Sequence, residues 1–241
     1  MKKMLIGILP LIGWVSFSSA DDLDEALEAE RREQTATAIT IIFDNSGSMD
    51  DGGKMFQAKS AFTQWLTTVP DYYSLGLIDF NAGRGRLVHE IGANLHEAIS
   101  IHVRAASPYG KTPVVDCLNL AKEAIRKRRA EHSPYERHVV VVFTDGRETV
   151  DSRGDRGVAR AILELRNEVV EVVGIGFHGE GDYMAPVATR YFEAGNEAEL
   201  LKGLSAVDAE IGGDQDIEIT EQDLATIEKL DIPLPPAPAA E

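Results

Sequence analysis

Two patterns of apolar residues alternate along this chain. Short continuous apolar runs are typical of buried strands, whereas apolar residues that recur every three or four positions are typical of amphipathic helices. The predicted strands cover 38–43, 74–80, 86–91, 139–143 and 169–177, with a short one near Tyr191. The predicted helices cover 54–68, 95–104, a segment after Thr112, 156–167 and a last segment with Leu200, Leu204, Val207 and Ile211.

Regular alternation of strands and helices predicts an α/β fold. We expect a doubly wound, mostly parallel six-stranded sheet with right-handed crossovers and helices on both faces. The strands at 74–80 and 86–91 are separated by only a short turn, Asn81-Ala82-Gly83-Arg84-Gly85, which indicates a hairpin. The hairpin would place one antiparallel strand at an edge of the sheet.

The amino terminus has the layout of a secretory signal peptide. Met1-Lys2-Lys3 precedes an apolar stretch from Leu5 to Phe17, and Ser18-Ser19-Ala20 offers a cleavage site after Ala20. The stretch is too short to span a bilayer comfortably, so we favour cleavage over an uncleaved anchor and expect an exported protein, periplasmic or secreted. The predicted organisation is a signal peptide at 1–20, an acidic arm at 21–36, a folded domain at 37–211 and an acidic flexible tail ending in prolines and alanines at 212–241.

The charge balance narrows the range of partners. The formal net charge is -16, and cleavage would remove two lysines and no acids, which makes it -18. This balance argues against nucleic acid as a partner. The basic run from Arg126 to Arg129 is expected to be a solvated helix end, where cations meet the negative end of the helix dipole. The single cysteine, Cys117, is interpreted as a buried packing thiol.

The loop after the first strand carries candidate metal ligands. Asp44 supplies a carboxylate, and Ser46 and Ser48 supply hydroxyls that a tight turn can aim inward, with Gly47 expected to allow the bend. Oxygen ligands of this kind suit Mg²⁺, Mn²⁺ or Ca²⁺. Because these groups leave the coordination shell incomplete, the carboxylate of a partner would complete it. The adjacent Asp50 and Asp51 are interpreted as first-turn acids of the next helix.

Two distant residues add to this set. Thr112 precedes Pro113 and an apolar ladder, so we expect it to cap the next helix, with Pro113 at the first helical position. Asp145 follows the apolar strand that ends at Phe143 and Thr144. Since Asp44 and Asp145 both follow buried parallel strands, the sequence predicts that they meet at one edge of the sheet.

These residues resemble the von Willebrand factor type A domain with its metal-ion-dependent adhesion site. That family has the pattern Asp-x-Ser-x-Ser, a distant Thr and a distant Asp, which stand here as Asp44, Ser46, Ser48, Thr112 and Asp145. The resemblance implies that the three hydroxyls contact the ion directly or exchange with water, and that the two aspartates often act through water. It also implies cation-dependent protein binding. We therefore expect an exported adhesion or assembly domain that captures an acidic side chain, Asp or Glu, of a protein partner.

Two alternatives stay open. In a phosphoryl-transfer enzyme of the haloacid dehalogenase kind, Asp44 would be the nucleophile and Asp145 would bind Mg²⁺. Ser46 then stands where that chemistry uses a second aspartate, which removes the general acid. In a structural or assembly protein, the ion would only brace the loops and partners would bind the helical faces.

Overall fold

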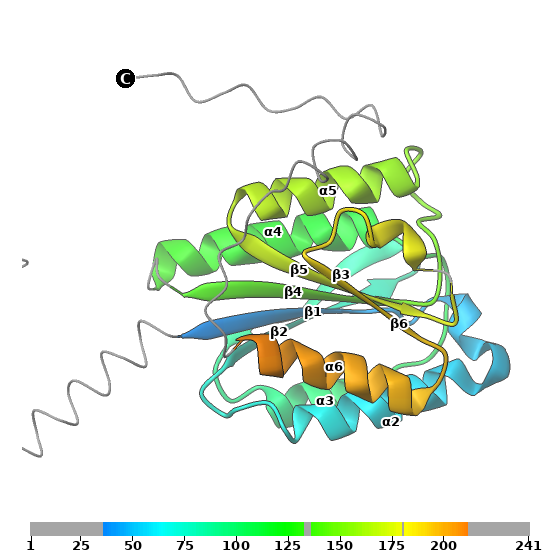
Figure 1. Cartoon of the computed structure of the whole chain (residues 1–241), viewed down its shortest axis with the longest axis horizontal. Helices are drawn as coiled ribbons and strands as arrows, with labels where there is room; N and C mark the ends of the chain where they lie inside the picture. Colours follow the sequence, from blue (N-terminus) through cyan, green and yellow to red (C-terminus); the bar gives the residue numbers. More distant parts are fainter. Residues whose placement is uncertain (1–35, 133–135, 180, 212–241) are drawn as a thin grey trace, which may run out of the picture.

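A six-stranded sheet forms the centre of the molecule (Figure 1). The computed structural model describes residues 36–132, 136–179 and 181–211, so the predicted signal peptide, the tail and all of the acidic arm except Ala36 lie outside the described residues. The strands are β1 (Thr37–Phe43), β2 (Ser74–Asn81), β3 (Arg84–Gly92), β4 (Arg137–Thr144), β5 (Val170–Phe177) and β6 (Arg190–Ala194). Their order is β3-β2-β1-β4-β5-β6, and only β3 runs antiparallel to its neighbour. The predicted doubly wound sheet with one antiparallel edge strand is confirmed.

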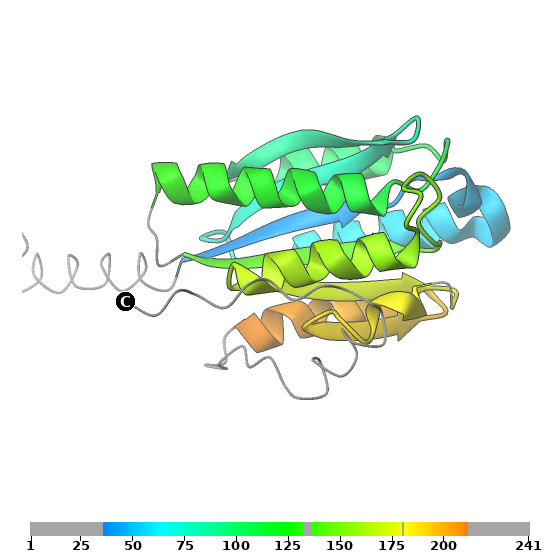
Figure 2. The same cartoon turned by 90° about the horizontal axis from the view of Figure 1, so that it is seen from above.

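Helices cover both faces of the sheet. They are α2 (Lys54–Leu66), α3 (His96–Ala105), α4 (Val114–Glu131), α5 (Asp155–Asn167) and α6 (Glu197–Ile211), with the 3₁₀ segments η1 (Gly47–Gly53) and η2 (Asp182–Met184). One layer consists of α2, α3 and α6, and the other of α4 and α5, which lie side by side along the sheet (Figures 1 and 2). No helix in the described part of the chain has both the length and the hydrophobicity that crossing a bilayer requires.

Strand periodicity explains how one strand serves two cores. Ile41 of β1 points into the layer with Phe62 of α2 and Leu200 of α6, whereas its neighbour Ile42 packs with Leu118 of α4. Every residue of β1 is buried, because a central parallel strand has a helix layer on each side. This two-sided burial is why β1 reads as a continuous apolar run.

Aromatic packing fixes the strand ends that carry the candidate ligands. The rings of Phe43 and Phe143 lie 5.6 Å apart, and each lies against Phe62 of α2, at 5.1 and 5.2 Å between ring centroids. Asp44 directly follows Phe43, and Asp145 is two residues beyond Phe143. The connection from β1 leads to β2 on one side, while β4 lies on the other, so this end of β1 is a topological switch point, where ligands bind in open α/β sheets.

Candidate metal centre

Asp44 is buried at the switch point, and both of its carboxylate oxygens accept hydrogen bonds. The Ser46 backbone N–H donates to Oδ1 at 2.7 Å, and the Thr144 hydroxyl donates to Oδ2 at 2.6 Å. Burial raises the pKa of Asp44 to about 6, and the charge of Asp145 adds to the rise, while the hydrogen bonds from Ser46 and Thr144 oppose it. A carboxylate in this position is stabilised by a nearby cation.

The two serines place their hydroxyls beside Asp145. Ser46 Oγ lies 3.1 Å from Ser48 Oγ, and the Ser48 hydroxyl donates to Asp145 Oδ1 at 2.7 Å. Gly47 lies between them, and its N–H donates to the Gly110 carbonyl at 3.0 Å. A Cβ on Gly47 would lie 3.3 Å from that carbonyl oxygen, and the φ of Gly47 is not positive. A side chain at this position would push the Gly110 carbonyl by a few tenths of an ångström, so the close approach of the two loops favours glycine. The bend itself does not require glycine, in contrast to the expectation.

Thr112 reaches the same place from a third loop. A Cβ on Gly146 would lie 3.6 Å from Thr112 Oγ1 and 3.8 Å from Ser48 Oγ, so both hydroxyls flank the residue after Asp145. Thr112 N–H donates to Thr149 Oγ1 at 2.9 Å, and Thr149 N–H donates to the Thr112 carbonyl at 3.1 Å. The structure thus brings all five predicted residues to one edge of the sheet.

The expected cap of α4 is wrong. The helix begins at Val114, and its N-cap residue is Pro113, with ψ near 59°. The N-cap side chain therefore makes no hydrogen bond to the helix. Instead the Val115 N–H donates to Glu148 Oε2 at 2.7 Å. Because Glu148 satisfies the helix end, the Thr112 hydroxyl is not engaged there.

Glu148 is a supporting residue that sequence reasoning missed. Its other oxygen accepts the N–H groups of Val150 and Asp151 at 2.7 and 2.9 Å, so a single buried carboxylate fastens the loop after Asp145 to α4. From η2, the Tyr183 hydroxyl donates to the Gly146 carbonyl at 3.3 Å. No local sequence pattern marks either contact, because each joins segments more than thirty residues apart.

Lys54 is the second residue that was missed. Its ammonium donates to Asp145 Oδ2 at 2.7 Å, and the side chains of Lys54 and Asp145 are 17% and 0% exposed. The sequence showed only that Gly52-Gly53-Lys54 lacks the spacing of a phosphate loop. Lys54 is the first residue of α2, after Gly53 in a left-handed conformation.

The acids beside the loop have a different place from the one expected. Asp50 and Asp51 are exposed in η1, and Gly52 and Gly53, both with positive φ, separate them from α2. The first turn of α2 contains no acid. The interpretation of Asp50 and Asp51 as acids at the dipole of the next helix is therefore wrong.

The ligand groups open onto a cleft of about 480 Å³. Its lining consists of Ser46, Ser48, Lys54, Gly110, Lys111, Thr112, Asp145, Gly146, Arg147 and Thr149. In the described residues no three His, Cys, Asp or Glu side chains gather in a way that could hold an ion. The hydroxyl and carboxylate oxygens at this cleft are thus the candidate donors, and such hard ligands fit Mg²⁺, Mn²⁺ or Ca²⁺.

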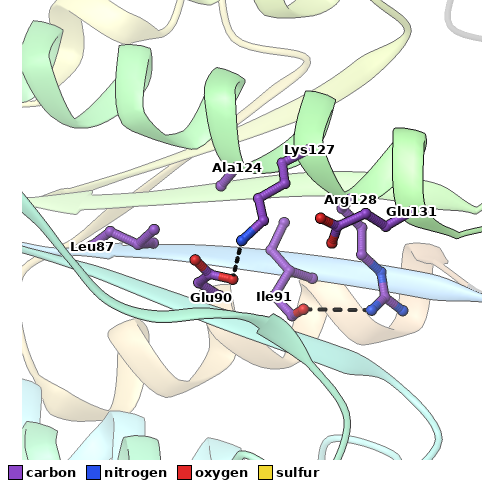
Figure 3. A pocket seen from close by; sticks show the side chains of 7 residues that line it. All are labelled: Leu87, Glu90, Ile91, Ala124, Lys127, Arg128 and Glu131. Atoms are coloured by element: carbon purple, nitrogen blue, oxygen red, sulfur yellow. Dashed lines mark hydrogen bonds and ion pairs between the residues drawn. The ribbon is translucent and has the colours of Figure 1, made fainter.

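A second, smaller pocket lies between β3 and α4 (Figure 3). Its volume is about 30 Å³, which is close to the space that one water molecule takes. Lys127 donates to Glu90 at 2.5 Å beside it, and Arg128 forms two 2.9 Å hydrogen bonds with the buried Glu136. The expectation of a simply solvated basic helix end is wrong for Arg128, whose side chain is 15% exposed.

A family model matches most of this chain and identifies its family. The model of the von Willebrand factor type A domain matches residues 38–211, which is most of the chain. This chain belongs to the von Willebrand factor type A (VWA) family. The match covers the predicted folded domain almost from end to end, and a comparison with curated protein sequences gave no match.

Solved VWA structures share the fold at low sequence identity. The VWA protein from Catenulispora acidiphila aligns with a TM-score of 0.62 and 19% identity over 75% of this chain and 44% of its own. The pilus adhesin SpaC from Lactobacillus rhamnosus GG aligns with a TM-score of 0.58 and 14% identity, over 73% of this chain and 30% of its own. Manganese-loaded TRAP from Plasmodium vivax aligns with a TM-score of 0.54 and 14% identity, over 71% of this chain and 72% of its own. This chain thus spans less than half the length of the first two proteins.

Proposed function

We propose that this VWA domain is an exported, divalent-cation-dependent protein-binding domain for adhesion or assembly. The observation that carries the proposal is the convergence of three hydroxyls and the buried Asp145 at one cleft that faces solvent, with the buried Asp44 directly behind Ser46. Ser46, Ser48 and Thr112 would bind the ion directly, and Asp44 and Asp145 would balance its charge, in part through water. The ion supplies a Lewis-acidic position for an oxygen of the partner.

The charges at the site support an added cation. Asp44 and Asp145 are both buried, and the ammonium of Lys54 is the one protein cation that bonds directly to this pair among the described residues. One positive charge against two leaves a deficit that a divalent ion would more than cover. An ion bound there attracts an acidic side chain, although the whole chain carries a charge of -16, because the ion is the largest local charge.

Binding is favoured over phosphoryl transfer by the position of Asp44. Its side chain is fully buried, both oxygens accept hydrogen bonds, and it does not line the cleft. A nucleophile must reach the substrate. The seryl hydroxyl of Ser46 also cannot protonate a leaving group as a carboxylic acid would.

Support from outside the geometry agrees with this function. The pilus adhesin SpaC and manganese-loaded TRAP share the fold, so the fold occurs both in an adhesin and in a metal-loaded protein. The leader-like amino terminus supports export to the periplasm or the medium. An acidic side chain, Asp or Glu, of another protein is the expected ligand.

Calorimetry tests the metal step, and affinity capture tests the partner step. We expect saturable uptake of one Mg²⁺ or Mn²⁺ by the intact protein and its loss in Asp44→Ala. In capture from the exported proteome, a partner should bind with Mg²⁺ and elute with chelator. No uptake by the intact protein, or the same uptake by Asp44→Ala as by the wild type, contradicts the metal site. Partner binding that persists in chelator favours a metal-braced structural role, and phosphatase turnover lost in Asp44→Asn favours an enzyme.

A further inference from the structure

The contact between Lys54 and Asp145 lies inside the candidate metal site. The two oxygens of Asp145 have different partners: Ser48 Oγ at 2.7 Å on Oδ1 and Lys54 Nζ at 2.7 Å on Oδ2. Both Lys54 and Asp145 line the cleft that also contains Thr112. The ammonium is therefore placed where it meets the carboxylate that a divalent ion would also need.

An ammonium and a divalent ion are poor neighbours on one carboxylate. Like charges a few ångströms apart repel strongly where burial lowers the effective dielectric constant, and Asp145 has no exposed side-chain surface. Lys54, in contrast, is at the mouth of the cleft with 17% of its side chain exposed. Its long flexible side chain can move toward water, whereas Asp145 cannot.

We propose that Lys54 is an intramolecular competitor of the metal ion. Its ammonium neutralises Asp145 when no divalent ion is bound, and the ion displaces it on binding. The inference rests on the proposed metal site. Lys54 then has two effects. It stabilises the metal-free fold, and it raises the concentration of divalent ion at which the adhesion site becomes active.

The experiment compares Lys54→Met with the matched variant Lys59→Met. Lys59 is on the same helix, partly exposed, and does not line the cleft. Titration of each full-length protein with Mg²⁺ alone should give a Kd for Lys54→Met that is about tenfold or more below that of the wild type, because a competing charge is gone. Lys59→Met should bind Mg²⁺ as the wild type does.

Thermal unfolding provides a readout that needs no partner. In EDTA, Lys54→Met should unfold about 2–4 °C below the wild type, as expected for a lost ion pair in a domain of this size. Saturating Mg²⁺ should abolish this difference. A double-mutant cycle with Asp145→Asn in EDTA should show that the two residues are coupled.

Three results overturn the inference. Equal or weaker Mg²⁺ binding by Lys54→Met shows that Lys54 does not compete, and would leave the proposed metal site intact if the wild type takes up the ion. Additive effects in the EDTA cycle show that the pair does not stabilise the metal-free fold. If neither the wild type nor Lys54→Met takes up Mg²⁺, the proposed metal site fails together with the competition.

Discussion

Three aspartates at the same edge of the sheet differ in how their charges are balanced. Asp79 of β2, Asp44 after β1 and Asp145 after β4 are 1%, 0% and 1% exposed. Asp79 forms an ion pair with Arg86 at 2.5 Å and a hydrogen bond with His102 at 2.9 Å. Asp145 forms an ion pair with Lys54, whereas Asp44 accepts hydrogen bonds only from a hydroxyl and a backbone N–H.

This difference separates a structural carboxylate from a ligand-binding one. Burying a charge is unfavourable unless it is paired, and Asp79 obtains its pair from the protein itself. Asp44 and Asp145 together have fewer protein cations than negative charges. At β2 the protein itself balances the buried charge, whereas at β1 and β4 the proposed divalent ion would do so.

The largest expected effect comes from the structural member of the three. Asp79→Ala should destabilise the protein by roughly 3 kcal/mol, because it removes the ion pair with Arg86 and the hydrogen bond with His102 and leaves a buried cavity. Its Mg²⁺ affinity should stay that of the wild type. Urea unfolding and calorimetry measure the two quantities, and a loss of Mg²⁺ binding in a folded Asp79→Ala protein would contradict the separation.

A buried histidine, His138, lies at the opposite end of the sheet, near the start of β4. Burial, together with the charge of Arg129, lowers the pKa of His138 on β4 to about 4, although Glu136 opposes the shift. His138 is 1% exposed, and its ring nitrogens have no hydrogen-bond partner in the described residues. Glu136 Oε2 lies 3.8 Å from its Nε2, which is beyond hydrogen-bond distance, and unlike Asp44 the buried His138 can stay neutral.

The buried His138 should make the stability of the fold depend on pH. The unfolded chain binds a proton near pH 6.5 and the folded protein only near pH 4, so stability is full above 6.5 and falls as the pH drops through this window. The loss is about 3 kcal/mol at pH 4. His138→Leu should lack this loss. Urea unfolding of both proteins in EDTA at pH 7 and 4.5 gives the difference, and parallel pH curves would refute it.

Asp44 should respond to neutralisation with the opposite sign from Asp79. At pH 7 in EDTA, Asp44→Asn removes a buried charge that no protein cation bonds, so it should stabilise the fold, by about 2 kcal/mol. Asp79→Asn should destabilise it under the same conditions. Urea unfolding with and without Mg²⁺ measures both, and the gain of Asp44→Asn should disappear in Mg²⁺. Destabilisation by both variants in EDTA would contradict the expected difference between Asp44 and Asp79.

The smallest expected change is at the support of the loop. Glu148→Gln removes the charge from the acceptor of all three N–H donors and leaves at least one donor facing an amide NH₂ that cannot accept, which should cost about 1 kcal/mol of stability. The Mg²⁺ affinity should fall roughly tenfold, as for other residues that orient ligands. Glu123→Gln, at an exposed site on α4, is the control. Unchanged affinity would show that Glu148 braces the loop without positioning Asp145.

Much of this architecture could be predicted because the signals are local. The run Val139 to Val142 is continuous since β4 is buried on both sides, and parallel strands necessarily deliver Asp44 and Asp145 to one edge. The hairpin between β2 and β3 followed from the short turn at Ala82 and Gly83. Periodicity and topology were sufficient for these features.

The supporting contacts could not be predicted because they join distant segments. Lys54 reaches Asp145 across 91 positions, and Glu148 reaches Val115 across 33. The errors at Thr112 and Gly47 share one cause: each was explained by its neighbours in sequence, whereas packing between loops decides its role. The error at Asp50 is local, because Gly52 and Gly53 delay the start of α2. Sequence reasoning therefore found the candidate ligands and missed the residues that hold and neutralise them.

The most direct test of the central claim is a crystal structure of the protein grown with Mn²⁺, with an anomalous difference map. We expect one strong peak within coordination distance of Ser46 Oγ, Ser48 Oγ and Thr112 Oγ1, with a coordination position facing solvent. No peak at this edge of the sheet, or a peak held by other residues, would contradict it.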